Sequence, residues 1–392
     1  MEEVIICSSA RTPIGSFFGQ FKNTSPVELG TAAVSEAIKR ANLKAENVDE
    51  LILGHVLSAG HGQNPARQVG IKVGLPESCP AGQVSILCAS GLKAVVDAAR
   101  TIKSGDASVV VAGGMESMST AVHGSNLRGK KAMGTFKMKE DNFDGVVLGD
   151  TMMVDGLTCA MNGIHMGITA ENIAERLSIS RAEQDEFAKR TVEKAINAKK
   201  NGLFKTEIVD VNGIDADEGP LICTAEEYAS FKPVFKKDGT VTKGNACGLN
   251  DGASAVVLAS KSSAESLGLN KVAKLVCSAV VGCDPKLMGL GPVFAIRKLM
   301  ERCPWKLNET DCFELNEAFA AQSLGCIREL GIDSSKVNIN GGSIALGHPL
   351  AASGCRILTT LISVLQQQSK TRGIAALCVG GGQGIAIAIE LL

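Results

Sequence analysis

The chain has 392 residues, of which 45% are hydrophobic and only 4% aromatic, and it contains 43 glycines. Such a chain is long enough for two or three domains whose cores are closely packed layers of small aliphatic side chains. Because 40 Lys and Arg residues nearly balance 41 Asp and Glu residues, we expect neither a nucleic-acid partner nor an anionic-membrane partner. The densest basic stretch, residues 128–139, fits either a solvated surface or a local site for ligand phosphates.

The cysteines indicate a reducing compartment. There are 13 of them, an odd number, with no CxxC pair and no histidine within five residues of a cysteine, so neither a disulfide framework nor a metal site is expected. A strand is already predicted at residues 4–6, and no apolar run reaches the roughly 18 residues of a membrane span. We therefore expect a cytoplasmic protein, although the mature form of a mitochondrial protein would look the same.

Residues 1–118 alternate short apolar runs with helical stretches. Strands are predicted at 4–7, 50–53 and 108–112, with helices at 26–41 and 90–103 between them. This alternation predicts an α/β half with a largely parallel sheet.

Residues 119–248 interrupt this pattern with polar and Gly-rich stretches. One amphipathic helix is predicted at 180–201, where Ser180 and Glu183 form a capping box. We interpret 119–248 as an inserted loop domain that binds substrate. A strand at 253–259 then completes the first half within residues 249–270.

Residues 271–392 repeat the plan of the first half. Strands at 274–278, 311–315 and 375–379 and a helix at 353–365 follow the earlier elements in order, each displaced by about 260–270 residues. The sequence therefore predicts two duplicated α/β halves.

Cys88 lies where an apolar run that resembles a strand meets the predicted helix at 90–103. Free N–H groups and the positive end of a helix dipole favour a thiolate, so we expect a lowered thiol pKa and a nucleophile. The alternative is a small buried hydrophobic residue.

His348 lies on a Gly-His-Pro turn just before the helix of the second half. This is the position equivalent to Cys88, so the duplication could bring both helix starts to one central site. The alternative is an ordinary exposed turn histidine.

Two further segments complete the candidate site. Cys378 precedes the run Gly380-Gly381-Gly382, and the alternating residues 385–389 that follow predict a hairpin strand rather than a dinucleotide-binding helix. Asn316 follows a predicted strand directly, at the end where α/β proteins usually build their sites.

Taken together, these segments resemble the thiolase family along the whole chain. The resemblance rests on the segments at 10–15, 62–68, 316–319, 347–349 and 378–384, and the segment at 165–172 resembles the biosynthetic, acetoacetyl-CoA branch. It implies a five-layer α/β/α/β/α core built from two βαβαβαββ halves, and a homotetramer.

The resemblance also implies roles for individual residues. Cys88 would be the nucleophile that becomes acylated, His348 its base and Cys378 a second acid/base. Asn316 would hold a water that, with His348, stabilises one thioester oxyanion, while the N–H groups of Cys88 and Gly380 stabilise the other.

The implied activity is that of an acetyl-CoA C-acetyltransferase, which converts two acetyl-CoA into acetoacetyl-CoA and CoA without a metal or separate cofactor. The residues expected to line the pantetheine and acyl pocket are His165, Met166, Phe235, Ala246, Cys247, Gly248, Met288, Ala318 and Phe319. A pocket narrowed by methionine and phenylalanine would favour short acyl groups.

The chain departs from the family pattern at several positions. Cys247 replaces a Ser, Ala351 replaces a Gly, residues 85–87 replace Asn-Lys-Val, and an Arg often found near Leu221 is absent. Three alternatives remain: a thiolase of broader chain length, a decarboxylating condensing enzyme of the ketoacyl-synthase type, and a non-catalytic lipid-binding protein. Cys378, where ketoacyl synthases have His or Asn, favours a thiolase.

Overall fold

The computed structural model describes residues 2–126, 146–219 and 224–392. The basic stretch at 128–139 and Leu221 lie outside these ranges. Within them, no helix is long and apolar enough to cross a membrane.

The strands follow the chain in this order: β1 (Val4–Arg11), β2 (Gly15–Ser16), β3 (Glu50–Gly54), β4 (Ala81–Val84), β5 (Val109–Ser117), β6 (His123–Gly124), β7 (Gly149–Asp150), β8 (Asn250–Ser260), β9 (Ala273–Gly282), β10 (Cys312–Leu315), β11 (Arg372–Val379) and β12 (Gln383–Leu391). The α-helices are α1 (Pro26–Arg40), α2 (Pro65–Lys72), α3 (Ser90–Ser104), α4 (Met166–Arg176), α5 (Arg181–Lys200), α6 (Ala225–Ser230), α7 (Lys261–Ser266), α8 (Gly291–Met300), α9 (Ala320–Leu330), α10 (Ser343–Leu346) and α11 (Leu350–Gln367). Short 3₁₀ helices cover Ala45–Asn47, Met118–Thr120, Pro285–Leu290, Leu307–Glu309 and Ser334–Lys336, and a π-helical segment covers Met152–Leu157.

The large sheet is mixed, so the prediction of a largely parallel sheet is wrong. Its order is β4-β3-β5-β8-β1-β9-β12-β11-β10, with β2 paired to β8. Parallel pairing joins β3 to β4, β3 to β5 and β10 to β11, whereas the other neighbours along this path are antiparallel. The reason is that β8 and β12 run back along the sheet beside β5 and β11, which alternation of strands and helices cannot reveal.

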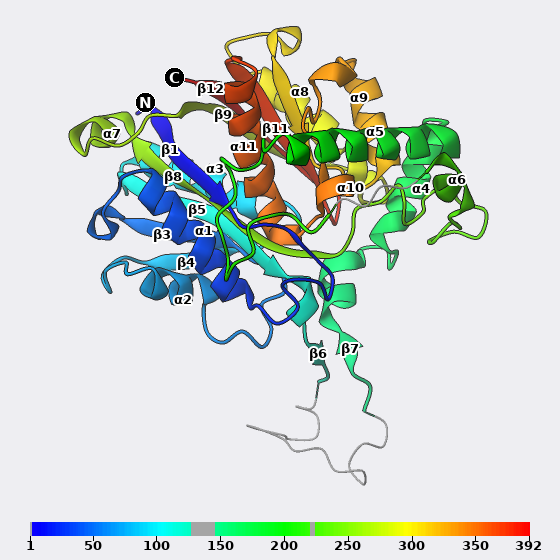
Figure 1. The fold of residues 1–392 in the computed structure, drawn as a ribbon, viewed down its shortest axis with the longest axis horizontal. Coiled ribbons are helices and arrows are strands. Elements are labelled where there is room, and N and C mark those ends of the chain that lie inside the picture. Colours follow the sequence, from blue (N-terminus) through cyan, green and yellow to red (C-terminus); the bar gives the residue numbers. More distant parts are fainter. Residues whose placement is uncertain (1, 127–145, 220–223) are drawn as a thin grey trace.

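Three hydrophobic cores give the five layers that the family resemblance implies. The central core joins α3 and α11 to one face of both halves of the sheet. On the other face, α1 and α2 pack over the first half, and α8 and α9 pack over the second. Figure 1 shows α3 and α11 side by side in the middle of the molecule, with the outer helices on either side.

The predicted repeat is present in three dimensions. β1, α1, β3, α3 and β5 correspond to β9, α8, β10, α11 and β11, and the halves join through antiparallel pairs between β1 and β9. The second half differs in one element, since the place of β4 is taken by a single bridge between Phe313 and Val337. The division into 1–118, 119–248 and 271–392 stays a prediction.

Between β5 and β8 the chain forms helices that cover the second half and a small β6–β7 hairpin that extends away from the body (Figure 1). The capping box at Ser180 and Glu183 begins α5 as predicted. Helices α4 and α6 were not predicted, since their apolar spacing is short and broken.

Candidate active site

The starts of α3 and α11 meet at the centre of the molecule, as expected from the duplication. They approach so closely that only glycine fits between them: a Cβ on Gly91 would lie 2.5 Å from the carbonyl oxygen of Ala351, and one on Gly354 would lie 2.6 Å from the amide nitrogen of Leu92. Cys88 lies two residues before α3, and His348 two residues before α11. The fold therefore carries both side chains to the same region.

Cys88 lies on a tight turn rather than at the end of a strand. β4 already ends at Val84, and Leu87 adopts a left-handed conformation with φ of 56°. Ser90 fixes this turn, because its hydroxyl donates to the carbonyl of Leu87 at 2.6 Å and accepts from the amide of Ile86 at 2.9 Å. The turn thus holds Cys88 in one orientation.

The thiol of Cys88 is protonated in the resting site, contrary to the expectation of a lowered pKa. Desolvation raises the pKa of Cys88 to about 11, although the backbone N–H groups of Gly380 and of Cys88 itself act against this rise. Burial destabilises the thiolate by more than the helix start and these N–H groups stabilise it. A nucleophile at this position consequently needs a base.

His348 is buried, with only 4% of its surface exposed, so the alternative of an exposed turn histidine is wrong. Its amide donates to Asn250 Oδ1 at 2.9 Å, and its ring nitrogens face Ser353 Oγ at 2.5 Å and Asn316 Nδ2 at 3.5 Å. Burial and the charge of Arg356 lower the pKa of His348 to about 3. The imidazole is therefore neutral and able to accept a proton.

Asn316 stands beside this imidazole at the end of β10. It is fully buried, its amide nitrogen donates to the carbonyl of Ala376 at 3.0 Å, and its Oδ1 accepts from Ser343 Oγ at 2.7 Å. The side-chain NH₂ is thus the part of Asn316 that faces His348.

Cys378 is the second-last residue of β11, and only Val379 separates it from the glycine turn. The hairpin predicted here is present, with Cys378 opposite Gly384 across the β11–β12 ladder. The turn must pass close to the nucleophile, because a Cβ on Gly380 would lie 2.6 Å from Leu87 Cδ1. This close approach explains how the Gly380 amide reaches the thiol of Cys88.

The thiol of Cys378 has three other thiols near it. Burial raises the pKa of Cys378 well above its usual value, and the nearby thiols of Cys88, Cys326 and Cys247 add to the rise. The pKa of Cys247 is raised by burial and by Cys88 in the same way. Cys247 therefore lies close to Cys88.

The residues predicted to form the acyl pocket gather around Cys378. Met166, Met288, Ala318 and Phe319 share one buried cluster with this thiol, and Phe235 and Ala246 pack against it. The amide of Cys247 donates to the carbonyl of Ala318 at 3.0 Å.

His165 reaches this cluster through Phe235, on which its ring stacks with centroids 4.6 Å apart. Its Nδ1 also accepts from the amide of Gly167 and so caps α4. The sequence analysis placed both rings in the pocket but predicted neither the stacking nor the helix cap.

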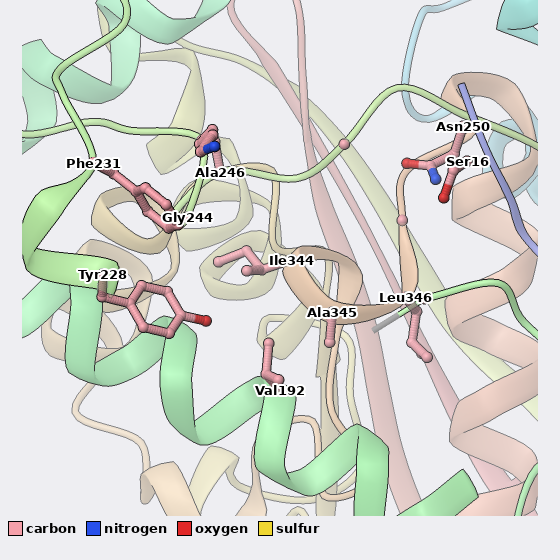
Figure 2. A pocket seen from close by; sticks show the side chains of 14 residues that line it. Ser16, Val192, Tyr228, Phe231, Gly244, Ala246, Asn250, Ile344, Ala345 and Leu346 are labelled. Carbon is pink, nitrogen blue, oxygen red and sulfur yellow. The ribbon is translucent and has the colours of Figure 1, made fainter. Parts of the chain in front are cut away.

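A cavity of about 330 Å³ leads toward the site (Figure 2). Of the predicted residues, Ala246 and Gly248 line it, and it extends to Gly347, next to His348. Figure 2 shows Tyr228 and Phe231 on one side and Ile344 on another. These residues were not predicted, nor was Lys243, whose ammonium lies 4.6 Å from the Phe231 ring centroid.

Glu116 is a second feature that sequence reasoning missed. This buried carboxylate at the end of β5 accepts from the amides of Leu57 at 3.0 Å and Ala351 at 3.1 Å, and so ties the first half to the start of α11. Burial raises the pKa of Glu116 to about 7, and its charge is felt by Cys88. The sequence signal that could have identified Glu116 was its position near the end of a strand, like that of Asn316.

A thiol, a neutral imidazole and a second thiol, set at the junction of two duplicated halves, define a cysteine-dependent acyltransferase. In the described part of the chain no group of three His, Cys, Asp or Glu side chains is placed to hold a metal ion.

The comparisons with known proteins agree with this class. The thiolase N-terminal domain matches residues 4–262 and the thiolase C-terminal domain matches residues 269–391. An acetyl-CoA acetyltransferase of Shinella zoogloeoides is 48% identical over 398 residues, covering 99% of both chains. The cytosolic acetyl-CoA acetyltransferase of Rattus norvegicus is 46% identical, covering 99% of this chain and 98% of its own.

A crystal structure of the Bacillus anthracis acetyl-CoA acetyltransferase superposes with a TM-score of 0.93 at 41% identity, covering 100% of this chain and 99% of that one. The chain belongs to the thiolase family.

Proposed function

We propose that this thiolase is an acetyl-CoA C-acetyltransferase, which reversibly condenses two acetyl-CoA into acetoacetyl-CoA and CoA. The observation that carries the proposal is the proximity of the Cys88 thiol to Cys378 and to the Gly380 amide, with the neutral His348–Asn316 pair at the start of the adjacent helix α11. The full-length similarity to proteins named acetyl-CoA acetyltransferase supports the choice of substrate.

The first half-reaction transfers an acetyl group to Cys88. The proton of the Cys88 thiol passes to His348 as the sulfur attacks the acetyl-CoA carbonyl and forms the new S–C bond. The C–S bond to CoA then breaks, and the leaving CoA sulfur takes a proton from Cys378. The products are acetyl-Cys88, free CoA, an imidazolium at His348 and a thiolate at Cys378, whose opposite charges stabilise each other in a buried site.

The second half-reaction forms the carbon–carbon bond. The Cys378 thiolate takes a proton from the methyl carbon of a second acetyl-CoA, and the enolate attacks the carbonyl carbon of acetyl-Cys88. As acetoacetyl-CoA forms, the Cys88 sulfur leaves and recovers the proton held by His348. Splitting the condensation in this way replaces one difficult step by two easier ones.

Both thioester oxygens acquire negative charge and need donors. The N–H groups of Cys88 and Gly380, which already face the Cys88 thiol, suit the acetyl-Cys88 oxygen. His348, once protonated, and a water held by Asn316 suit the thioester oxygen of the second acetyl-CoA. The reaction needs no metal and no cofactor besides the CoA thioesters.

The buried cluster of Met166, Met288 and Phe319 supports a preference for acetyl and acetoacetyl groups, because it closes the space beside Cys378. The cavity between Tyr228, Phe231 and Ala246 is the proposed path of the pantetheine arm. We further propose a homotetramer, as the family resemblance implies, and a cytoplasmic location, in line with the word "cytosolic" in the name of the rat relative.

The test is cleavage of acetoacetyl-CoA by added CoA, followed by absorbance, beside the same assay with a 3-ketoacyl-CoA of eight or more carbons. The proposal expects a much higher kcat/KM for acetoacetyl-CoA. Equal rates would favour a thiolase of broader chain length, and condensation that requires a malonyl thioester would favour a ketoacyl-synthase type. Binding without any turnover would favour a non-catalytic acyl-CoA-binding protein.

A further inference from the structure

A continuous chain of polar contacts crosses the site from a buried arginine to a backbone carbonyl. Arg356 Nη2 donates to Ser343 Oγ at 2.5 Å, and Ser343 Oγ lies 2.7 Å from Asn316 Oδ1. Asn316 Nδ2 then lies 3.5 Å from His348 Nε2. The chain continues from His348 Nδ1 to Ser353 Oγ at 2.5 Å, and Ser353 Oγ lies 3.2 Å from the carbonyl oxygen of Pro349.

The guanidinium end of this series of contacts sets the direction of donation as far as the imidazole. A guanidinium can only donate and a carbonyl can only accept. Because Ser343 accepts from Arg356, its single hydroxyl hydrogen is directed to Asn316 Oδ1. At the other end, Ser353 Oγ is placed to accept from His348 Nδ1 at 2.5 Å while its own hydrogen is directed to the Pro349 carbonyl at 3.2 Å.

The imidazole in the middle is thereby fixed in one protonation pattern. Asn316 presents its NH₂ group, a donor, to Nε2, and this arrangement suits an imidazole whose hydrogen is on Nδ1, facing Ser353. A neutral imidazole has one N–H, so Nε2 holds the free electron pair.

We infer that Arg356 and Ser343 are positioning residues that set the neutral tautomer of His348, keeping Nε2 free to take the proton of the nucleophile. Neither side chain belongs to the group that touches the reacting thioester; they act through the orientation of the Asn316 amide. The inference concerns how the proposed base is prepared, and so its kinetic part rests on the proposed function.

Because no member of this series of hydrogen bonds faces open solvent, its pattern of donors and acceptors has to be satisfied within the protein. Arg356 is 2% exposed, and Ser343, Asn316 and Ser353 are fully buried. An amide that turned around by 180° would place its oxygen toward Nε2 and leave the Ser343 hydroxyl facing an NH₂ group. Such a mismatch in a buried network is costly, so one orientation prevails.

Arg356 is available for this task because its acidic neighbours do not bind it closely. Glu314 approaches its Nη1 only to 3.8 Å, and Glu207 makes its ion pair with Arg11 at 2.7 Å. The guanidinium also feels the charge of Glu317. Within the described residues, the hydrogen bond to Ser343 is the one that the Arg356 side chain makes.

The direct test is solid-state ¹⁵N NMR of protein labelled at its 5 histidines, with His348 assigned by the signal lost in His348→Asn. The expected spectrum at neutral pH shows His348 with a protonated Nδ1 and an unprotonated Nε2. A protonated Nε2 with an unprotonated Nδ1 would overturn the inference, whatever the enzyme's activity. This measurement uses the unaltered protein and does not depend on any variant folding.

Two variants then test the link to Arg356. Ser343→Ala removes the hydroxyl that links Arg356 to Asn316, so the Asn316 amide is free to turn around. We therefore expect a second His348 signal with Nε2 protonated and a kcat lowered by about tenfold at unchanged KM. Ser343→Thr keeps the hydroxyl and should restore the original tautomer. Ser363→Ala removes a buried serine elsewhere on α11 and should change neither.

The outcomes separate the two hypotheses. If the wild-type protein lacks thiolase activity but shows the expected tautomer, the proposed function fails and the structural inference stands. If the protein is an active thiolase and Ser343→Ala changes neither tautomer nor kcat, the inference fails alone.

Discussion

The starts of α3 and α11 are equivalent positions in two copies of one fold, yet they hold their reactive side chains by different means. Cys88 is held by the backbone, through the left-handed turn at Leu87 and the amide of Gly380. His348 is held by side chains, through Ser353 on one ring nitrogen and Asn316 on the other.

This difference follows from what each group must do. A sulfur that becomes acylated needs donors that stay in place while charge appears and disappears, and amides in a tight turn provide them. A base must have a defined tautomer, and the hydrogen bonds of its two ring nitrogens select one. In the proposed mechanism, the residues around these two equivalent positions make Cys88 a nucleophile and His348 a base.

The largest expected effect comes from removing the nucleophile. Cys88→Ala should lower the rates of condensation and thiolysis by on the order of 10⁴–10⁶-fold, as loss of a covalent nucleophile does elsewhere. Steady-state assays in both directions measure this. Cys277→Ala, which removes a buried thiol of the outer core, is the matched control and should stay active. Substantial activity in Cys88→Ala would place the nucleophile elsewhere.

A smaller loss is expected at the second thiol. Cys378→Ala should slow carbon–carbon bond formation by about 10²–10⁴-fold, the usual contribution of a positioned acid/base. Acylation of Cys88 should suffer less, because water or His348 can protonate the leaving CoA. Single-turnover acylation compared with overall condensation measures the two steps. Equal losses in both would contradict separate roles for the thiols.

The buried carboxyl of Glu314 predicts that the stability of the fold depends on pH. Burial raises the pKa of Glu314 to about 8, above its value in an unfolded chain. A carboxyl of this kind stabilises the fold while it is protonated and costs stability as pH rises toward 8. The unfolding free energy of the wild type should fall between pH 5 and 9 relative to Glu314→Gln, by at most a few kcal/mol. Parallel denaturation curves for the two proteins at each pH would reveal a constant difference if this is wrong.

The smallest effect is expected at Cys247, where the chain departs from the family pattern. A Ser hydroxyl is a better hydrogen-bonding group than a thiol, so Cys247→Ser should lower KM for acetoacetyl-CoA by up to about tenfold. Because Cys247 lies near Cys88, kcat should also be measured. A KM that is unchanged or higher would rule out a contact with CoA.

Much of this architecture could be predicted because it depends on local patterns. The buried strands, the capped helix at Ser180 and the repeat spacing all survive in the structure. The antiparallel direction of β8 could not be predicted, since it depends on where an insertion of more than a hundred residues returns to the sheet.

In the candidate site, too, the features that depend on local patterns could be predicted and those that depend on tertiary packing could not. Cys88, His348, Asn316 and Cys378 sit at strand ends and helix starts, which sequence patterns identify. The pKa of Cys88 was predicted with the wrong sign, because burial depends on tertiary packing. The links from Arg356 to His348 were also out of reach, since a hydrogen-bond chain has no sequence signature.

The central claim is that Cys88 carries the acetyl group. The most direct measurement is peptide mass spectrometry after brief mixing of the protein with acetyl-CoA and acid quenching. The mechanism predicts one acetyl group per chain, on the peptide that contains Cys88 and absent in Cys88→Ala. An acetyl group on Cys378 or Cys247 instead, with Cys88 unmodified, would contradict it.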